Sequence, residues 1–400
     1  MTATTGAAIG DTTVAAAGAV LVPDDSDERR SRRPLTTSGR PGDRVAHRVD
    51  LVRWFVGALA VLAIGAYVVV ALLRFRTGSE LEWMEGGMVQ GVRDVLAGHS
   101  PYGPPTLAST PYLYTPLFTY LGAAVSWVVG PGLEPLRAIS IVSSFVALWA
   151  TSRLIVVETR DRWAGLVGAG VLAASYVVCG AWFDVARVDS LMLALLLVGL
   201  LLVRTARDAR LAAVAGLVMV LAVMAKQDAL LVALACVPWT CRRGRRTAVA
   251  YVASLMGGLG VTVVLLQVLT GGGFLYYLLD VPAAHRLVPS EYLGFITRDL
   301  RPFLWAGALV ALGLVTVRRR VGSTGIRWWF VAPVVGSLLL TGWVGRVHSG
   351  GWDNVLIPAV AGIALLVGIA AAVVRHRATT WVVVACLALL VGQFAALRWS

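Results

Sequence analysis

The sequence has little charge and almost no lysine. Only 14% of its 400 residues are Asp, Glu, Lys or Arg, whereas soluble globular domains carry about 25%. Hydrophobic residues make up 58% and the mean hydropathy is +0.77. These values exclude a string of soluble domains. Apolar runs of about 15 to 24 residues, separated by short arginine-bearing stretches, recur from Leu51 onward and predict an all-α polytopic membrane protein.

Cysteine and nucleotide-binding motifs are also scarce. The four cysteines lie in or beside apolar runs without CxxC or His/Cys spacing, which excludes a disulfide framework and a zinc site. There is no GxGxxG after a strand, no P-loop and no soluble nucleotide-sugar domain. The first 20 residues lack the basic start of a cleavable signal peptide. Residues 1–50 are therefore expected to form a disordered basic tail, which its seven arginines place in the cytoplasm.

Positive charge, in contrast, is abundant. The net charge is +13, and 34 of the 35 basic residues are arginine, with Lys226 the only lysine. The arginines cluster at span ends, where they set orientation, so no nucleic-acid partner is predicted. If 112–130 were a span, the arginine-rich loop at 158–162 would lie outside, so we interpret 112–130 as an interfacial or re-entrant helix. Inner loops then hold sixteen basic residues and outer segments eleven.

This register gives about eleven transmembrane helices in the plasma membrane, with the N-terminus inside. They are expected at 51–73, 135–157, 163–182, 190–204, 210–225, 228–240, 247–268, 302–317, 328–342, 354–373 and 379–397. We divide the chain into the tail (1–50), a catalytic module (51–270, with outer loop 74–134) and a C-terminal module (271–400, with outer loops 269–301 and 343–353).

Two predicted spans, 190–204 and 228–240, are shorter than the ~20 residues that cross a bilayer. Ionisable residues lie at their outer ends, namely Asp184, Arg187, Asp189, Lys226 and Asp228. Charges at that depth are kept when they face one another or a water-filled cavity. The alternative is that some of them, Arg187 and Asp228 above all, extend to the interface as ordinary span-end residues.

The first outer loop combines an amphipathic helix with a proline-rich return. The helix begins at Glu85, where an acid meets the positive end of the helix dipole, and ends at Leu96-Ala97-Gly98-His99-Ser100-Pro101-Tyr102. A second interfacial helix follows Tyr114-Thr115-Pro116-Leu117. With Asp184 to Asp189 and Ala225-Lys226-Gln227, this order resembles the GT-C superfamily of membrane glycosyltransferases, which includes protein mannosyltransferases and bacterial lipid A sugar transferases. The resemblance covers about residues 51–270.

The resemblance implies a polyprenyl-phosphate-linked sugar as donor and an active site outside the cytoplasm. The superfamily's first-loop acid, its proposed catalytic base, falls on Glu85, and its second-loop acid falls on Asp189 or Asp184. Its outer lysine falls on Lys226. Two positions differ: Met84 stands where many members have an Asp before the Glu, so Glu82 is a second candidate base. Thr115 stands where some members have a phosphate-binding lysine, which leaves donor phosphate binding to other cations.

The chemistry points to the same residue types without the resemblance. Displacement of a phosphate at an anomeric carbon needs a carboxylate to accept the hydroxyl proton and cations to stabilise the departing phosphate. Lysine acts there as a compact point charge. The candidate cations are Lys226, Arg187, Arg286 and Arg346, and the secondary candidates are Glu82, His99, Tyr114, His348 and Asn354.

Several alternatives stay open at this point. Glu85, Asp184 and Asp189 could supply oxygen ligands to Mg²⁺ or Mn²⁺, although no spacing demands a cation. The acceptor could be an envelope glycan, a lipid or a protein. A transporter or lipid flippase is the first alternative function, although no repeated halves are visible. A non-catalytic subunit of envelope assembly is the second, suggested by the missing Asp beside Glu85.

Overall fold

The computed structural model describes residues 41–107, 110–319 and 325–397. Of the predicted basic tail, residues 1–40 lie outside this described part, whereas residues 41–50, expected to be disordered, form the start of α1 (Pro41–Phe75). Within the described part the chain forms α-, 3₁₀- and π-helices and no named strand, which confirms the all-α class. Contacts divide the chain into Met1–Ala46 and one compact unit, His47–Ser400, and the description below concerns the second unit. The division into modules at residue 270 stays a prediction.

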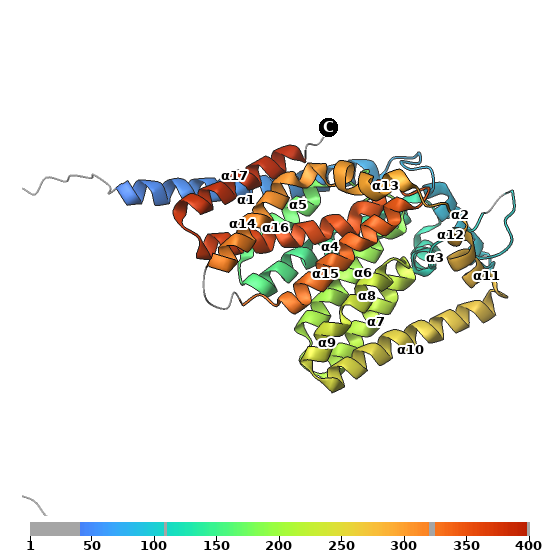
Figure 1. The fold of residues 1–400 in the computed structure, drawn as a ribbon. Coiled ribbons are helices and arrows are strands. Elements are labelled where there is room, and N and C mark those ends of the chain that lie inside the picture. The colour runs from blue at the N-terminus through green and yellow to red at the C-terminus, as the bar shows by residue number, and fades with distance from the viewer. Residues whose placement is uncertain (1–40, 108–109, 320–324, 398–400) are drawn as a thin grey trace, which may run out of the picture. The chain divides into compact units, whose positions relative to one another are not determined.

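Seven helical stretches in the described residues are long and apolar enough to cross a membrane. They are Val49–Phe75, Leu133–Thr159, Val188–Thr205, Arg245–Leu269, Pro289–Arg318, Trp328–Val347 and Asp353–Arg377. The corresponding elements are α1 (Pro41–Phe75), α4 (Leu133–Thr159), α6 (Val188–Thr205), α10 (Arg245–Leu269), α14 (Leu304–Arg319), α15 (Trp328–Val347) and α16 (Ile357–Arg377) (Figure 1).

Shorter apolar helices account for the other predicted spans. They are α5 (Arg162–Ala174), α7 (Ala209–Ala225), α8 (Ala229–Ala235), α9 (Val237–Arg243) and α17 (Thr380–Ala396). Each of the eleven predicted ranges thus falls on helix, while the span count itself stays a prediction. The span expected at 163–182 differs, because α5 ends at Ala174 and a loop of turns follows to Arg187. In that loop Gly180 and Ala181 both have positive φ, a conformation that is costly for alanine.

Two interfacial helices were expected in the first outer loop, and both are present. They are α2 (Glu85–Leu96), which begins at the predicted residue, and α3 (Leu117–Val129), which follows Pro116. They pack on each other and on the start of α4. Between α10 and α14 the chain forms a series of short helical elements: α11 (Gly273–Leu275), η2 (Tyr276–Asp280), α12 (Val281–Ala283), α13 (Pro289–Gly294), η3 (Phe295–Asp299) and η4 (Arg301–Phe303).

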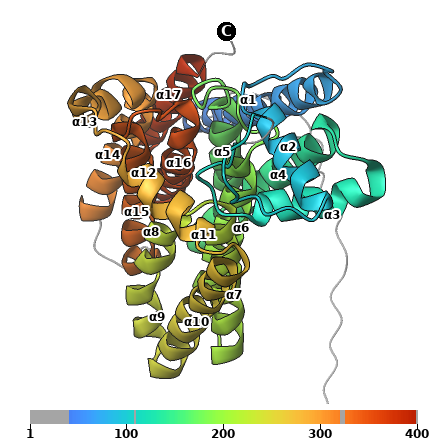
Figure 2. The same cartoon turned by 90° about the vertical axis from the view of Figure 1, so that its right-hand side faces the viewer.

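These elements meet at one end of the helix bundle. Figures 1 and 2 show α2, α3, α11 and α12 gathered there. The Tyr102 ring packs edge-on against Phe274, with 5.3 Å between ring centroids, and Tyr277 donates a hydrogen bond to the carbonyl of Gly103. Helix packing of α4 on α6 and α6 on α7 brings the starts of α4 and α6 beside the end of α7. The turn η5 (Asp353–Leu356) joins them before α16.

Candidate functional site

Six segments that are distant in sequence bring charged side chains together at this end of the bundle. They are the turn before α2, the Tyr114 segment, the α5–α6 loop, the first turn of α6, the end of α7 and η5. From them come Glu82, Glu85, Tyr114, Asp184, Arg187, Asp189, Lys226 and Asn354, all of which were predicted from the sequence. Most are buried, as ion pairs must be when they persist at membrane depth.

Glu85 is fully buried, and hydrogen bonds occupy both of its carboxylate oxygens. Arg137, on α4, donates to Oε1 from Nε (2.9 Å) and to Oε2 from Nη2 (2.7 Å). The backbone N–H groups of Ala186 and Leu81 donate to the same oxygens, each at 2.7 Å. Burial would raise the pKa of Glu85, but the hydrogen bonds from Arg137 and the two N–H groups lower it below its usual value. This carboxylate is a fixed, ionised centre.

Arg137 also holds the loop that leads to α2. Its guanidinium donates to the carbonyl oxygens of Arg74 (3.3 Å), Thr77 (2.6 Å) and Ser79 (2.8 Å). The side chain is completely buried. The Glu85–Arg137 pair therefore joins α2, α4, the α1–α2 loop and the α5–α6 loop.

Glu82 lies one turn before Glu85 and has a different environment. Its Oε2 accepts hydrogen bonds from Arg187 Nη1 (3.0 Å) and from the N–H of Met84 (3.1 Å). Its Oε1 is buried and has no hydrogen-bond partner among the described residues. Burial raises the pKa of Glu82 above its usual value, although the Arg187 charge opposes this. Glu82 thus keeps one buried carboxylate oxygen that accepts no hydrogen bond from the described residues.

Arg187 connects Glu82 to an aromatic cluster. Its Nη2 donates to the Tyr114 hydroxyl at 2.6 Å, and its guanidinium lies 4.8 Å from the ring centre of Trp182 and 5.2 Å from that of Tyr114. Aromatic faces at this distance stabilise a cation. The Arg187 Nε is buried without a partner in the described structure.

Asp189 and Lys226 form the next pair, 2.9 Å apart and both buried. Asp189 Oδ1 also accepts a hydrogen bond from Asn354 Nδ2 (3.0 Å), which ties η5 to α6. Lys226 Nζ lies 3.4 Å from Asp228 Oδ2 and 5.9 Å from the centre of the Tyr114 ring. Tyr114 is therefore shared by Arg187 and Lys226.

Asp184 is the fourth buried acid of this region, and it lies in the α5–α6 loop. Its Oδ1 accepts a hydrogen bond from the Tyr176 hydroxyl (2.8 Å) and lies 3.3 Å from Arg74 Nη1. Burial raises the pKa of Asp184 to about 6, against the opposing charge of Arg74. The two acids proposed for the second loop, Asp184 and Asp189, thus have separate cations.

Unpartnered polar atoms concentrate here. Of the seven buried side-chain N or O atoms without a hydrogen bond in the described structure, five belong to this region, namely Glu82 Oε1, Asp184 Oδ2, Arg187 Nε, Asp189 Oδ2 and Gln227 Oε1. Buried polar groups are otherwise nearly always satisfied. The orphaned set includes acceptors and a donor, which suits a polar ligand with hydroxyl groups and negative charge.

The other predicted residues have different positions. Arg346 is engaged by two carboxylates, with its Nε 2.7 Å from Asp299 Oδ2 and its Nη2 2.7 Å from Asp353 Oδ1. Arg286 and His99 are exposed. His348 shares a hydrogen bond between Nδ1 and the Val344 carbonyl (2.8 Å). None of these four makes a hydrogen bond or ion pair with the buried acids of the candidate site, Glu82, Glu85, Asp184 and Asp189.

The expected divalent-cation ligands do not form one set. Glu85 pairs with Arg137, Asp184 with Arg74, and Asp189 with Lys226. Among the described residues no group of three or more His, Cys, Asp or Glu side chains has an arrangement that could hold a metal ion.

Arg74 and Arg137 are site residues that sequence reasoning missed, because both were counted only as outer-side charges near span ends. Arg137 did carry a signal. It stands alone as a cation at the start of a long apolar helix, and an ionisable residue inside a span is by default a functional candidate.

Two solved structures have a similar fold. They are ArnT from Cupriavidus metallidurans bound to undecaprenyl phosphate (13% identity, TM-score 0.57) and the same protein in the apo state (12% identity, TM-score 0.56). In both comparisons the similarity covers 78% of this chain and 59% of the ArnT chain. No family profile and no curated protein sequence matches the chain. At this identity the likeness shows the fold alone, and it confirms the expected GT-C-like fold.

Proposed function

We propose that this protein is an inverting glycosyltransferase that moves a sugar from a polyprenyl-phosphate donor to an envelope glycan, lipid or protein outside the cytoplasm. One observation carries the proposal: buried acids and cations with unsatisfied polar atoms converge at one end of a GT-C fold. The fold neighbour ArnT was solved with undecaprenyl phosphate bound, which supports a donor of that class. The clustering of arginines at the opposite end supports an outward-facing site in the plasma membrane.

The proposed reaction is a single displacement. The acceptor hydroxyl oxygen bonds to the anomeric carbon as the bond from that carbon to the phosphate oxygen breaks. The hydroxyl proton passes to a carboxylate, and the electron pair of the broken bond leaves with the polyprenyl phosphate. The protein must supply the carboxylate and the positive charge that stabilises the leaving phosphate.

We assign the base to Glu82 and a positioning role to Glu85. Both oxygens of Glu85 are occupied by hydrogen bonds from Arg137 and from backbone N–H groups. Glu82 keeps Oε1 free of protein partners, and its raised pKa makes it a better proton acceptor than an ordinary glutamate. Through Arg137, Glu85 fixes the turn from which Glu82 projects.

Arg187 and Lys226 are the proposed cations for the donor phosphate. Arg187 keeps a buried Nε–H without a protein acceptor, and both cations contact the same Tyr114 side chain. Asp189, which also accepts a hydrogen bond from Asn354, holds Lys226 in place. Arg346 is already paired with Asp299 and Asp353, so we give it a structural role in this proposal.

Substitutions of Glu82 and Glu85 test the two assigned roles separately. A deletion strain should accumulate a truncated envelope glycan, lipid or protein, which mass spectrometry of the envelope fractions would identify. Complementation with Glu82→Gln should restore less than about 1% of the product, since a general base contributes 10² to 10⁴ in rate. Only one Glu82 oxygen accepts hydrogen bonds, so the Gln amide oxygen can retain them, and the variant should keep its expression level and its undecaprenyl phosphate binding.

Glu80, an exposed acid of the same loop, gives the matched control, and Glu80→Gln should restore the product fully. Glu85→Gln should lower the expression level and the melting temperature as well as the amount of product, because breaking a buried ion pair costs about 3 to 5 kcal/mol. A fully active Glu82→Gln protein would contradict the base assignment. Solute uptake by proteoliposomes that contain only this protein would instead favour a transporter.

A further inference from the structure

A second pocket lies at the opposite end of the bundle, between the end of α9 and the start of α15. It has a volume of about 410 Å³. Its walls contain three arginines and three tryptophans: Arg242, Arg243, Arg327, Trp239, Trp328 and Trp329. Helix α15 separates it from the candidate site, and its 20 residues span about 30 Å. This pocket is therefore distinct from the proposed reaction centre.

The pocket has an excess of positive charge. The one buried acid beside it, Glu158, is paired with Arg204 and accepts the backbone N–H of Arg327 at 3.0 Å. No carboxylate of the described residues pairs with Arg242, Arg243 or Arg327, all of which are exposed. Three arginines thus remain available to an anion.

Tryptophan rings contact two of these arginines. The Arg242 guanidinium lies 4.6 Å from the Trp329 ring centre, and that of Arg243 lies 5.9 Å from the Trp239 ring centre. Arg243 Nη2 also donates to the Ala206 carbonyl at 2.9 Å. Tryptophan is typical of the headgroup level of a bilayer, so the pocket suits the polar end of a lipid.

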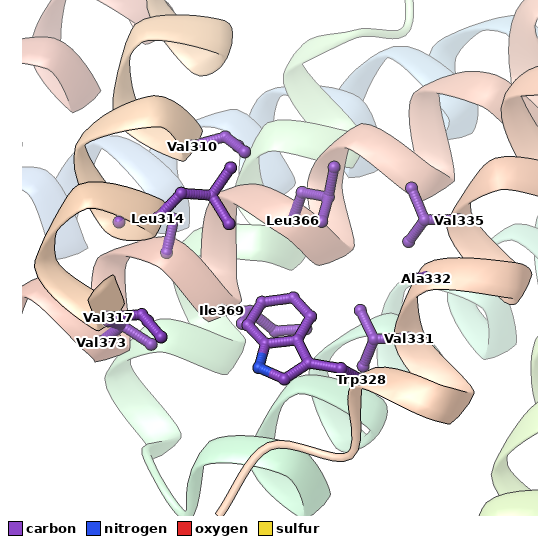
Figure 3. A pocket seen from close by; sticks show the side chains of 12 residues that line it. Val310, Leu314, Val317, Trp328, Val331, Ala332, Val335, Leu366, Ile369 and Val373 are labelled. Carbon is purple, nitrogen blue, oxygen red and sulfur yellow. The ribbon is translucent and has the colours of Figure 1, made fainter. Parts of the chain in front are cut away.

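A separate apolar groove shares one wall residue, Trp328, with this pocket. It lies between α14, α15 and α16 and has a volume of about 240 Å³. Figure 3 shows the Trp328 indole projecting into it, beneath Leu314 and Leu366. Trp328 lines both the basic pocket and the groove. All other groove residues are aliphatic or glycine, so the groove offers a surface to a hydrocarbon chain.

We propose that this combined site binds an anionic phospholipid of the inner leaflet. The phosphate would lie among Arg242, Arg243 and Arg327, and one acyl chain would lie in the groove beside Trp328. Basic pockets between transmembrane helices on the cytoplasmic side suit such headgroups. Charge complementarity and an apolar groove on the other side of the shared Trp328 together favour a lipid over a soluble anion. The proposal does not depend on the transferase reaction.

The test measures lipid binding to the purified full-length protein. Native mass spectrometry in detergent would titrate a phosphatidylglycerol, a phosphatidylcholine with the same acyl chains, and glycerol 3-phosphate. We expect saturable binding of phosphatidylglycerol alone. The Arg242→Gln/Arg327→Gln variant should weaken it about 30-fold, at ~1 kcal/mol for each arginine. The matched control is Arg245→Gln/Arg246→Gln, which removes two exposed arginines of the next turn and should bind as the unsubstituted protein does.

A groove variant keeps the proposal testable if the arginine variant does not fold. Ala332 lines the groove and is itself exposed. Ala332→Phe should therefore fill the groove without changing any charge, and it should weaken phosphatidylglycerol binding at least tenfold. Equal weakening by the control arginine pair, equal binding of phosphatidylcholine, or binding of glycerol 3-phosphate as tight as that of the lipid would each overturn the proposal.

Discussion

Glu82 and Glu85 lie three residues apart and have opposite electrostatic surroundings. Glu85 receives four hydrogen bonds, two of them from Arg137 in a bidentate pair, and such pairs fix geometry strongly. Glu82 receives two hydrogen bonds on one oxygen and none on the other. A carboxylate that must accept a proton needs a free oxygen within reach of the substrate. The same turn thus provides a structural acid and a candidate base.

The residue scale also gives a prediction about pH. The pKa of Asp184 in the folded protein is about 6, above its usual value near 4, because the carboxyl is buried. Its contribution to stability is therefore complete below about pH 4 and is lost as the pH rises through about 6. The Asp184→Asn side chain stays neutral. Between pH 5 and pH 8 the free energy of unfolding of this variant should therefore rise by ~1.5 kcal/mol relative to that of the unsubstituted protein. Thermal unfolding in detergent at both pH values measures this difference.

Asp280, an exposed acid, is the control for that experiment, and Asp280→Asn should leave the pH dependence unchanged. Because Asp184→Asn also removes the partner of Arg74, its melting temperature at a single pH is not informative. The change between the two pH values is the diagnostic quantity. Parallel curves for Asp184→Asn and the unsubstituted protein would contradict the assigned pKa.

The burial of charged side chains could be anticipated where charge stands at the end of a short apolar run, while the functional roles of these residues stay predictions. Asp184, Asp189 and Lys226 were identified because placing a charged side chain at membrane depth costs free energy, so such residues are functional candidates. The sequence does not show in the same way which side chains contact one another. Arg187 lies 105 residues from Glu82 and 73 from Tyr114, and only the folded chain shows that these three side chains meet.

At the scale of elements, α5 and α16 pack through a reciprocal pair of glycines. A Cβ on Gly168 would lie 3.0 Å from the Ala364 carbonyl oxygen, and one on Gly368 would lie 2.9 Å from that of Ala164. Each helix thus places a small residue four positions before its glycine, a spacing that allows close approach of transmembrane helices. The carbonyls belong to helix backbone and cannot yield easily.

Larger residues at these glycines should therefore weaken the bundle. Gly168→Val and Gly368→Val are each expected to cost about 1 to 3 kcal/mol by overpacking, with a lower melting temperature measured in detergent. Gly336 on α15 is the matched control, because a Cβ there would meet no heavy atom within 4 Å. A melting temperature for Gly368→Val equal to that of Gly336→Val would contradict the close packing.

Periodicity and hydropathy placed the helices but not all of their ends. The starts of α2 and α3 follow from Glu85 and from Pro116, which are local signals. The end of α5 at Ala174 was missed because Tyr176, Val177 and Val178 continue the apolar run. The loop that follows is held by side-chain contacts, such as the hydrogen bond that Tyr176 donates to Asp184, eight residues later. Hydropathy alone does not register such contacts.

At the scale of the whole molecule, the two ends of the bundle differ in their charge chemistry. At the end with the candidate site, acids and cations are matched in buried pairs such as Asp189–Lys226. At the other end Arg242, Arg243 and Arg327 are exposed and unpaired with any carboxylate of the described residues. Matched pairs suit a site that must bind both an acceptor and a phosphate. Unmatched arginines suit a cytoplasmic membrane surface.

This asymmetry predicts the orientation of the chain, and the native cysteines allow it to be measured. Cys241 is exposed at the end of α9, whereas Cys179, Cys236 and Cys386 are buried. A membrane-impermeant maleimide should therefore label the protein in inverted membrane vesicles and leave it unlabelled in intact cells. Ser100→Cys, in the exposed first loop, should give the reverse result in a Cys241→Ala background. Labelling of Cys241 from outside intact cells would place the candidate site in the cytoplasm, where a polyprenyl-phosphate transferase with outward-facing chemistry could not operate.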